Sequence, residues 1–528
     1  ETDGWYYVEY NGGRGWIGPG KEANGFAIRI MGTPGADRPT VTPPGGSTAG
    51  FSLQTSGVGL SDVNVVTTNT VVYGILVSSP LVTVSSVSVD SGGRITGAGI
   101  FLSSGGAVSY SSITVQNADG VRITGSSNTI SFTTASVTAF SRAAFYFNGA
   151  SSTTLQDSFG YGNPVYGAFL YHSHRNVLAR NTLRKVSAAA GAAGLFLNDA
   201  SSNTVTESFV SNAGGAGADL SVNAHNNLIE LSSITAAGAV YDGLLLGHGN
   251  GNRFSRLYVY SRDGNAGSLS SGSSESTVEL STFVSAYAGA RALGTNGSSE
   301  TITGNLLLAP AGTALGLFGS SITVSRNVGF TANGSYPGLY VAGGGYVAIR
   351  DSSFENSAGD GGKLERTAWV DILRSTIAGA GGGGYAGLRL EGASSNTVTA
   401  SRLSAPGGVG LSIGSYLELF DMTTTTGVEN VFSGLTVVGS TAVSVSASHG
   451  GSLASSVLYG DPSGAGLVLG AENAGVLALS SLTVRGARAA LAFGDAVVVA
   501  TVTGISIDGT SAVSADGTTL LPGSRVTV

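Results

Sequence analysis

One short pattern recurs through most of the 528-residue chain at intervals of about 24 residues. Each copy has a small residue, an apolar residue, a variable residue and a second apolar residue, followed by a polar turn often spelled Ser-Ser-Asn-Thr. Three clear copies start at Gly120, Gly194 and Gly387. A repeat of this length predicts units that bury their apolar faces only by stacking on their neighbours, so it constrains the fold more than any other feature.

The small residue at the start of each copy serves as a marker of the repeat. Between the clear copies we place it at Ala144, Ala168 and Ala218. Continued along the chain, this spacing predicts about 19 coils. The step from Gly410 to Ala442 is longer than the others, which predicts extra residues in one turn.

The apolar residues inside each copy alternate with period two over three to five residues, between turns rich in Gly, Asn and Ser. This alternation indicates short strands, whereas we find no capped segment with the 3.6-residue periodicity of a helix. Helical repeats are longer than about 24 residues, and the Leu and Asn spacing of leucine-rich repeats is missing. The sequence therefore predicts an all-β fold in which three short strands form each coil of a parallel β-helix.

The turn sequence also resembles a known family. The segment Ala-Ser-Ser-Asn-Thr-Val-Thr occurs at residues 200–206 and again at 393–399. It is similar to the coils of right-handed parallel β-helix repeat proteins, especially large secreted or surface proteins of bacteria. The resemblance covers about residues 49–510 and implies an extracellular or cell-surface location. It leaves the activity open, because this fold occurs in pectin-degrading enzymes, phage tailspikes, adhesins and structural rods.

The composition excludes several classes of function. The chain has no Cys, so it contains no disulfide framework, zinc ribbon, iron–sulfur cluster or thiol nucleophile. Its net charge of -7 argues against a nucleic-acid partner, since phosphate binding needs a dense basic surface. No apolar run approaches the 18 to 20 residues of a transmembrane helix. We expect no cofactor and no bound metal.

The two ends of the chain are candidates for assembly. We expect residues 1–48 to form an N-terminal β segment, either a cap or an assembly segment, and residues 49–528 to form the β-helix with an enlarged turn near 416–438. A terminal coil exposes unpaired backbone groups that can pair with another chain, so we expect a homo-oligomer that packs end to end or laterally. The predicted assembly residues are Trp5, Tyr6, Tyr7, Tyr10, Leu520, Leu521, Val526 and Val528.

Asparagines recur at one turn of successive copies. Stacked side-chain amides can hydrogen-bond to one another and to backbone groups at the ends of strands, so we interpret these residues as structural. The predicted ladder consists of Asn128, Asn176, Asn203, Asn227 and Asn252.

Apolar side chains also fall at positions that we expect to face outward, namely Tyr146, Leu170, Phe196 and Leu245. Solvent favours polar residues there, and contiguous exposed apolar surface usually marks a contact. We predict lateral contacts through these residues, either packing against another chain or stacking on a glycan, unless side loops cover them.

A catalytic function rests on weaker signals. Asp219 and Asp242 precede strands of adjacent coils and can form the carboxylate pair that glycosidases use, although a solvated pair at a turn is the simpler interpretation. His248 lies in a Gly-His-Gly segment reminiscent of a motif in pectin-hydrolysing β-helix enzymes. The paired aspartates and the Arg-Ile-Lys segment of that family are missing, so its chemistry is not carried over.

Histidines and one aspartate also gather near a single turn of successive coils. Such a group can bind a metal or exchange protons, but the offsets within the coils vary and exposed histidines are common at turns. We therefore assign no metal site to His172, His174, Asp199, His225 and His248.

These observations lead to two functional hypotheses. The first is an extracellular structural β-helical rod that self-assembles into a filament, a sheath or a surface layer, without catalytic activity. The alternative is a carbohydrate-active enzyme or a glycan-binding adhesin that acts on a polysaccharide along one lateral face. A lateral groove lined by aromatic residues and carboxylates distinguishes the second hypothesis from the first.

Overall fold

The computed structural model contains two compact units, residues 1–263 (unit 1) and 264–528 (unit 2), which we describe separately. Every regular element among the described residues is a β-strand, and none of these residues is helical. The described residues are 6–10, 13–22, 25–32, 38–43, 45–139, 143–382, 384–417, 424–446, 448–470, 477–493, 500–508 and 513–515.

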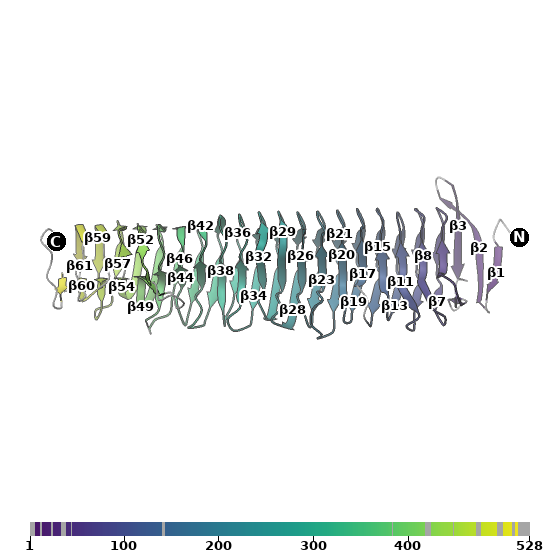
Figure 1. Cartoon of the computed structure of the whole chain (residues 1–528), viewed down its shortest axis with the longest axis horizontal. Helices are drawn as coiled ribbons and strands as arrows, with labels where there is room; N and C mark the ends of the chain where they lie inside the picture. Colours follow the sequence, from purple (N-terminus) through teal and green to yellow (C-terminus); the bar gives the residue numbers. More distant parts are fainter. Residues whose placement is uncertain are drawn as a thin grey trace. The chain divides into compact units, whose positions relative to one another are not determined.

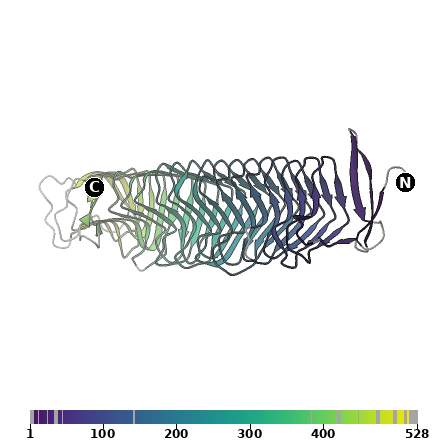
Figure 2. The same ribbon diagram turned by 45° about the vertical axis from the view of Figure 1, so that its right-hand side comes forward.

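Unit 1 begins with antiparallel strands and continues as a parallel solenoid (Figure 2). Strands β1 (Tyr6–Tyr10), β2 (Gly13–Glu22) and β3 (Gly25–Gly32) pair antiparallel, and β3 then pairs in parallel with β6 of the solenoid. The segment predicted as an N-terminal β element therefore joins the solenoid through a ladder of backbone hydrogen bonds.

Each coil of unit 1 adds one strand to each of three faces, and each strand pairs in parallel with the equivalent strand of the next coil. Face 1 contains β5 (Ala49–Leu53), β8 (Val71–Val77), β11 (Ile95–Leu102), β14 (Asp119–Ile123), β17 (Ala143–Asn148), β20 (Tyr166–Tyr171), β23 (Leu195–Asn198), β26 (Ala218–Ser221) and β29 (Leu244–Asn250). Face 2 contains β6 (Gly59–Ser61), β9 (Thr83–Ser85), β12 (Ala107–Ser109), β15 (Thr129–Ser131), β18 (Thr154–Gln156), β21 (Val177–Ala179), β24 (Thr204–Thr206), β27 (Leu228–Glu230) and β30 (Arg253–Ser255). Face 3 contains β4 (Thr40–Val41), β7 (Asn64–Val66), β10 (Ser88–Asp90), β13 (Ser112–Val115), β16 (Thr134–Val137), β19 (Phe159–Gly162), β22 (Thr182–Lys185), β25 (Phe209–Asn212), β28 (Ser233–Ala239) and β31 (Tyr258–Asp263).

Unit 2 repeats the three-faced arrangement. Its face 1 contains β32 (Gly267–Ser274), β35 (Arg291–Thr295), β38 (Thr313–Leu317), β41 (Leu339–Ala342), β44 (Gly362–Glu365), β47 (Ala386–Glu391), β58 (Ala465–Leu469), β60 (Ala489–Phe493) and β62 (Val513–Ala515). Its face 2 contains β33 (Thr277–Glu279), β36 (Thr301–Thr303), β39 (Ile322–Ser325), β42 (Gly345–Arg350), β45 (Ala368–Leu373), β48 (Thr397–Thr399), β53 (Val431–Ser433) and β56 (Ser452–Ala454). Its face 3 contains β34 (Thr282–Ser285), β37 (Leu306–Leu308), β40 (Val328–Thr331), β43 (Ser353–Asn356), β46 (Thr376–Ala378) and β57 (Val457–Tyr459). Four longer strands contribute to two faces each, namely β49 (Arg402–Gly414), β54 (Thr436–Val445), β59 (Leu477–Arg485) and β61 (Ala500–Asp508).

Within each unit the strands form successive layers (Figure 1). The described residues make about 18 turns, about 24 residues apart, against the 19 that the repeat predicts. The predicted parallel β-solenoid is therefore confirmed. The physical basis is that each coil leaves its backbone donors and acceptors unpaired until the next coil covers them.

The segment expected to hold the enlarged turn contains a short side element. The stacked residues Asn396 and Asn430 are 34 positions apart, more than one regular coil. Between them, β50 (Tyr416–Leu417) pairs antiparallel with β51 (Thr424–Thr425). A further short pair, β52 (Gly427–Val428) with β55 (Ser448–His449), lies beside the main solenoid strands.

The inward side chains form continuous apolar ladders. Across β14, β17 and β23 the register aligns Val121, Phe145 and Leu195 through the small residue Ala168 of β20. All four are 0% exposed. Because parallel pairing puts equivalent residues directly above one another, aliphatic and aromatic side chains pack along the axis of the coil.

A column of small residues sets how closely the coils can approach at the start of face 1. A Cβ on Gly120 would lie 2.5 Å from the carbonyl oxygen of Ala144, and one on Gly217 would lie 2.6 Å from that of Gly243. A Cβ on Gly387 in unit 2 would lie 2.5 Å from the carbonyl oxygen of Gly410. These distances are shorter than van der Waals contact, so glycine is a steric requirement of coil stacking at these three positions, whereas Ala144 is accommodated in the same column.

The asparagines expected to stack lie in one buried column of unit 1. The Nδ2 groups of Asn176, Asn203 and Asn227 donate to the Oδ1 of the asparagine in the next coil at 3.0, 3.1 and 3.1 Å. The backbone N–H of each donates to the same oxygen, and Asn252 ends the run. The N–H of Asn128 reaches this column through Thr153, whose hydroxyl accepts at 3.4 Å. Each coil thus satisfies buried polar groups of its neighbour.

A carboxyl group takes the corresponding position in unit 2. Glu300 is 1% exposed, its Oε2 accepts from the N–H of Ser276 at 3.0 Å, and its Oε1 lies 2.9 Å from the hydroxyl of Ser273. That hydroxyl also lies 2.7 Å from the carbonyl oxygen of Ser270. The single Ser273 hydroxyl proton is thus shared between two acceptors, the Glu300 carboxyl group and the Ser270 carbonyl oxygen. Burial raises the pKa of Glu300 to about 7, against the hydrogen bonds from Ser273 and Ser276, which lower it.

The glycine column predicts a specific loss of stability. Gly217→Ala adds a methyl group 2.6 Å from the carbonyl oxygen of Gly243, so we expect it to lower the free energy of unfolding by about 1 to 3 kcal/mol. Gly45→Ala is the control, because its Cβ would contact only Asn69, at 3.9 Å. Chemical denaturation of the full chain measures both. Equal stability of the two variants would contradict the steric interpretation.

Glu300 predicts a pH dependence of stability. Because its folded-state pKa is above the usual value, the stability linked to its proton is fully present below about pH 4.5 and is lost as the pH rises through 7. Glu300→Gln keeps the shape of the side chain and one acceptor oxygen but does not ionise. We expect the variant to gain up to about 3 kcal/mol over the wild type between pH 4.5 and pH 9. Denaturation at several pH values tests this, and a pH-independent difference would contradict it.

Candidate functional site

The outward residues of face 1 in unit 1 form a continuous row of unusual composition. Register across β14, β17, β20, β23, β26 and β29 aligns six outward residues, Arg122, Tyr146, Phe169, Phe196, Asp219 and Leu245. The residues on either side of each in the strand point into the core, because side chains alternate along a strand. The solenoid therefore brings one cation, three aromatic rings and one carboxyl group into a single line, which we call the outer row.

The aromatic rings of the outer row stack on one another. The ring centroids of Tyr146 and Phe169 are 5.3 Å apart, and those of Phe169 and Phe196 are 4.9 Å apart. Tyr166 lies nearly parallel to Phe196, at 5.0 Å and 11°. Tyr146 is fully buried and has the Arg122 guanidinium 5.7 Å from its ring centroid, whereas the other three rings are partly exposed. We call the partly exposed rings Tyr166, Phe169 and Phe196 the aromatic platform.

Polar side chains flank the platform on the same face. Two positions further along the strands, the register aligns Asn148, Tyr171, Asn198 and Ser221, and all four are partly exposed. Amide and hydroxyl groups of this kind can both donate and accept hydrogen bonds. Face 1 of unit 1 therefore combines flat apolar rings with neutral hydrogen-bonding groups.

The aromatic platform ends at Asp219. The Ser221 hydroxyl donates to the Asp219 carboxylate at 2.5 Å, which favours the charged form. Burial raises the pKa of Asp219 more strongly than this bond lowers it, and the negative charge of Asp242 raises it further. Burial and the nearby Asp219 charge also raise the pKa of Tyr166. A carboxyl group with a raised pKa that interacts with a second carboxylate is an arrangement suited to general acid–base chemistry.

The predicted lateral contacts require one correction. Phe196 and Leu245 do belong to the outer row, and Tyr146 belongs to it but is covered. Leu170 instead points inward, is 0% exposed and aligns with Phe147. The expectation was wrong because it used Ala168 as the marker residue of this coil.

The close-contact glycine of that coil is Gly167, one residue earlier than expected. A Cβ on Gly167 would lie 2.7 Å from the carbonyl oxygen of Gly194 in the next coil, which identifies it as the member of the glycine column. This shift moves Phe169 and Tyr171 to the outside, and sequence reasoning missed both together with Tyr166 and Ser221. The alternation in Ala-Phe-Leu-Tyr identifies Phe169 and Tyr171 when it is aligned on Gly167.

The structure does not bring the histidines that lie near one turn of successive coils together into one site. His172 Nδ1 lies 2.5 Å from the Asp199 carboxylate, and His174 Nδ1 lies 2.8 Å from the hydroxyl of Ser201. His225 Nδ1 accepts from a backbone N–H in the next coil at 3.0 Å. Among the described residues, no group of three or more His, Asp or Glu side chains has the geometry of a metal site.

His248 is exposed and lies three residues beyond Leu245, the register partner of Asp219. Three residues of strand span about 10 Å, so His248 is displaced along the coil from the carboxyl pair. The structure thus associates Asp219 with Asp242 and leaves His248 apart.

The predicted assembly residues fall outside what the structure describes in detail. Trp5, Leu520, Leu521, Val526 and Val528 lie outside the described residues. Three others, Tyr6, Tyr7 and Tyr10, belong to β1, which is described by its backbone pairing with β2. The assembly role of these residues stays a prediction. In the described part of the chain, no helix is long and apolar enough to cross a membrane.

Face 1 of unit 2 carries paired charges in place of an aromatic platform. Arg389 holds the Asp360 carboxylate with two hydrogen bonds, at 2.8 and 3.1 Å. Lys363 bridges Glu365 and Glu391 at 2.7 and 2.9 Å. Each of the two cations thus pairs with a carboxylate of a neighbouring coil, which supports a stabilising role for the network.

The Asp219 environment predicts opposite shifts for two substitutions. Ser221→Ala removes the hydrogen bond that favours the charged carboxylate, so it should raise the pKa of Asp219. Asp242→Asn removes a like charge and should lower this pKa. Carboxyl ¹³C NMR titration of the full chain measures both, with Ser131→Ala on face 2 as the control. Shifts of the same sign in the first two variants would contradict the described geometry.

Comparison with known proteins places this solenoid among its relatives. No curated protein sequence matches the chain. Among solved structures, the Dettilon tailspike protein gp208 is 15% identical over 54% of this chain, with a TM-score of 0.40, and the match spans only 60% of the tailspike chain. The A-module of the mannuronan C-5 epimerase AlgE4 from Azotobacter vinelandii is 14% identical, with 92% of this chain and 91% of that one covered and a TM-score of 0.28. PfbA, a surface adhesin of Streptococcus pneumoniae, is 12% identical, with 62% and 82% covered and a TM-score of 0.27.

One protein family matches directly. The family described as the right-handed beta helix region matches residues 98–283 and 291–450. These segments together cover more than half of the chain and include both units. The chain therefore belongs to the right-handed β-helix family.

Proposed function

We propose that the protein binds a polysaccharide along face 1 of unit 1 and cleaves a glycosidic bond at Asp219. The observation that carries this proposal is the aromatic platform that ends at a carboxyl group with a raised pKa, beside a second carboxylate. Sugar rings present apolar C–H faces that pack on flat aromatic rings, and their hydroxyls pair with amide and hydroxyl side chains. The outer row and its polar flank supply both kinds of contact.

The two carboxyl groups suit different roles in this reaction. Asp219 retains its proton to higher pH and donates it to the glycosidic oxygen as the bond to the anomeric carbon breaks. Asp242 accepts a proton from the water whose oxygen bonds to that carbon. One water is consumed, and each product ends in a hydroxyl group. Ser221 is a positioning residue, because its hydroxyl holds the Asp219 carboxyl group.

The alternative of a self-assembling rod rests on residues near the chain ends. Those residues lie outside the described parts or are described by backbone alone, so filament, sheath and surface-layer assembly stay predictions. We favour polysaccharide recognition because the outer row places three aromatic rings and the Asp219 carboxyl group on one face, which are the residue types that the second hypothesis requires. An extracellular or cell-surface location belongs to this proposal, since long polysaccharides are met there.

Substitutions separate binding from cleavage. Asp219→Asn removes the donated proton but keeps the side-chain shape, so we expect cleavage to fall at least about 100-fold with little change in affinity. Phe169→Ala and Phe196→Ala should weaken binding about tenfold each. Affinity electrophoresis in gels with neutral or acidic polysaccharides measures binding, and a reducing-end assay on the same polymers measures cleavage.

The matched control is Phe132→Ala, which removes an aromatic ring, 47% exposed, outside the outer row. Activity of the wild type should also decline as the pH rises through the pKa of Asp219, since only the protonated carboxyl group can donate the proton to the glycosidic oxygen. Cleavage by Asp219→Asn at the wild-type rate would exclude the catalytic role. Equal effects of the Phe132 and Phe196 substitutions on affinity would exclude the platform.

A further inference from the structure

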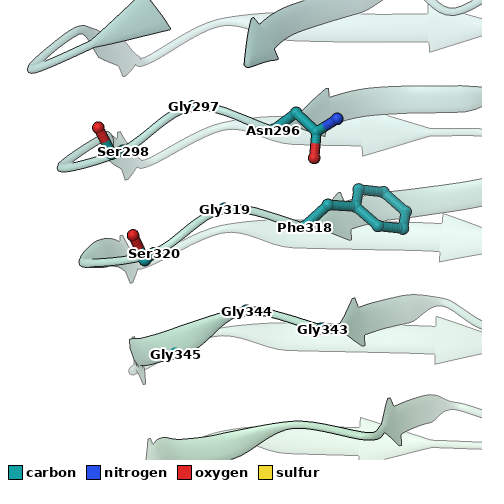
Figure 3. Close-up of a pocket in the computed structure, with 9 residues that line it drawn as sticks. All are labelled: Asn296, Gly297, Ser298, Phe318, Gly319, Ser320, Gly343, Gly344 and Gly345. Atoms are coloured by element: carbon teal, nitrogen blue, oxygen red, sulfur yellow. The ribbon is translucent and has the colours of Figure 1, made fainter. Parts of the chain in front are cut away.

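A cavity of about 230 Å³ opens at the turn between faces 1 and 2 of unit 2. It is lined by residues 296–298, 318–320 and 343–345, which come from three successive coils. Figure 3 shows Asn296 and Phe318 on two successive coils, with Gly343 in the third. Likewise Ser298 pairs with Ser320, and the third coil has Gly345. The cavity exists because two columns of side chains stop at glycines.

The floor of this groove has to remain free of side chains. A Cβ on Gly319 would overlap the carbonyl oxygen of Gly297, and a Cβ on Gly344 would overlap that of Gly319. Glycine is therefore required on three successive coils, and backbone groups line the bottom of the groove. The groove is a fixed feature of the coil stacking and does not depend on how side chains turn.

Two exposed aromatic side chains stand at one end of the groove. Tyr346 directly follows Gly345, and Trp369 occupies the equivalent turn position of the next coil, with ring centroids 4.9 Å apart and an interplanar angle of 12°. They are 64% and 53% exposed. A Cβ on Gly345 would lie 3.7 Å from the Trp369 ring, which places the indole beside the groove. The equivalent positions of earlier coils hold Ser299 and Ser321, so the fold does not need aromatic residues there.

We propose that this groove and its aromatic pair form a second glycan-binding subsite, for one neutral hexopyranose ring of a polysaccharide. Pockets for drug-sized ligands have volumes of about 300 to 1,000 Å³. The smaller cavity here, of about 230 Å³, accommodates a single sugar ring. The stacked Tyr346 and Trp369 rings face the apolar side of the sugar, while Asn296, Ser298, Ser320 and backbone groups meet its hydroxyls.

The groove lining favours a neutral sugar over an acidic one. The nine residues that line it carry no charged side chain, and Arg291, whose guanidinium lies 4.4 Å from the Phe318 ring centroid, is not among them. A carboxylate or sulfate group therefore gains no ionic partner from the lining itself. The nine residues also include no carboxyl group, so the subsite retains the polymer and does not cleave it. The inference rests on the proposed function for its ligand class, but it concerns different residues in the other unit.

The tryptophan content of the chain provides a local probe. The three tryptophans are Trp5, Trp16 and Trp369, so the full chain labelled with 5-fluorotryptophan gives three ¹⁹F NMR signals, and Trp369→Phe identifies the relevant one. Titration uses hexaoses of glucose, mannose, galactose and galacturonate. We expect at least one neutral hexaose to shift the Trp369 signal in a saturable way and galacturonate to leave it unchanged.

Three variants assign the response to the groove. Gly345→Asn fills the cavity at a position whose Cβ has space, and Tyr346→Ser restores the residue type of the neighbouring coils. Each should weaken the affinity reported by Trp369 about tenfold or more. The matched control is Tyr110→Ser, which breaks another exposed stacked pair, with Phe132 in unit 1, where the ring centroids are 4.9 Å apart.

The outcomes also separate this inference from the proposed function. Phe196→Ala should leave the Trp369 response unchanged while it weakens polysaccharide binding by unit 1. A Trp369 signal that no neutral hexaose moves, that only galacturonate moves, or that moves equally in Gly345→Asn overturns the subsite. A normal Trp369 response together with unchanged polysaccharide binding and cleavage in Phe196→Ala and Asp219→Asn overturns the proposed function alone.

Discussion

The structure depends on the close approach of successive coils, which lets each backbone complete the hydrogen bonding of the next. At the start of face 1 this approach leaves room only for very small residues, and in some coils only for glycine, as the contact between the site of a Cβ on Gly217 and the carbonyl oxygen of Gly243 shows. The same closeness brings the asparagine amides within 3.1 Å of one another. Glycine, asparagine and the inward apolar residues therefore recur for a single reason.

Stacking also creates the candidate sites. Residues separated by a full coil become neighbours, so Phe169, Phe196 and Asp219 form a line although they are far apart in the chain. Where a column of similar side chains continues, it makes a platform or a ladder. Where it stops at glycine, as at Gly343 and Gly345, it leaves a groove. Each coil changes one layer of a surface, so substitutions in single coils can alter binding without altering the fold.

Ionisable groups show how position within the coil decides behaviour. Glu300 replaces an amide in a buried column, where its oxygens accept hydrogen bonds from Ser273 and Ser276 while burial raises its pKa to about 7. Asp219 lies on an outer face, where burial by neighbouring rings and the charge of Asp242 raise its pKa. Asp360 and Arg389 pair across coils and neutralise each other. The chemistry of these groups follows from the layer above and below as much as from the residue itself.

The sequence by itself determined the fold, because the 24-residue spacing, the alternation of apolar residues and the recurrent Asn and Gly each express a local requirement of stacking. It also predicted that Phe196 and Leu245 face outward, and it named Asp219 and Asp242 as a candidate carboxylate pair. It misplaced Leu170, since one residue of phase error turns every side chain of a strand to the opposite side. Only the tertiary structure decided that Phe169 and Tyr166 complete a platform ending at Asp219, and that Tyr346 and Trp369 adjoin a groove. Those facts depend on register between coils and on which neighbours cover a side chain, and no single copy of the repeat contains that information.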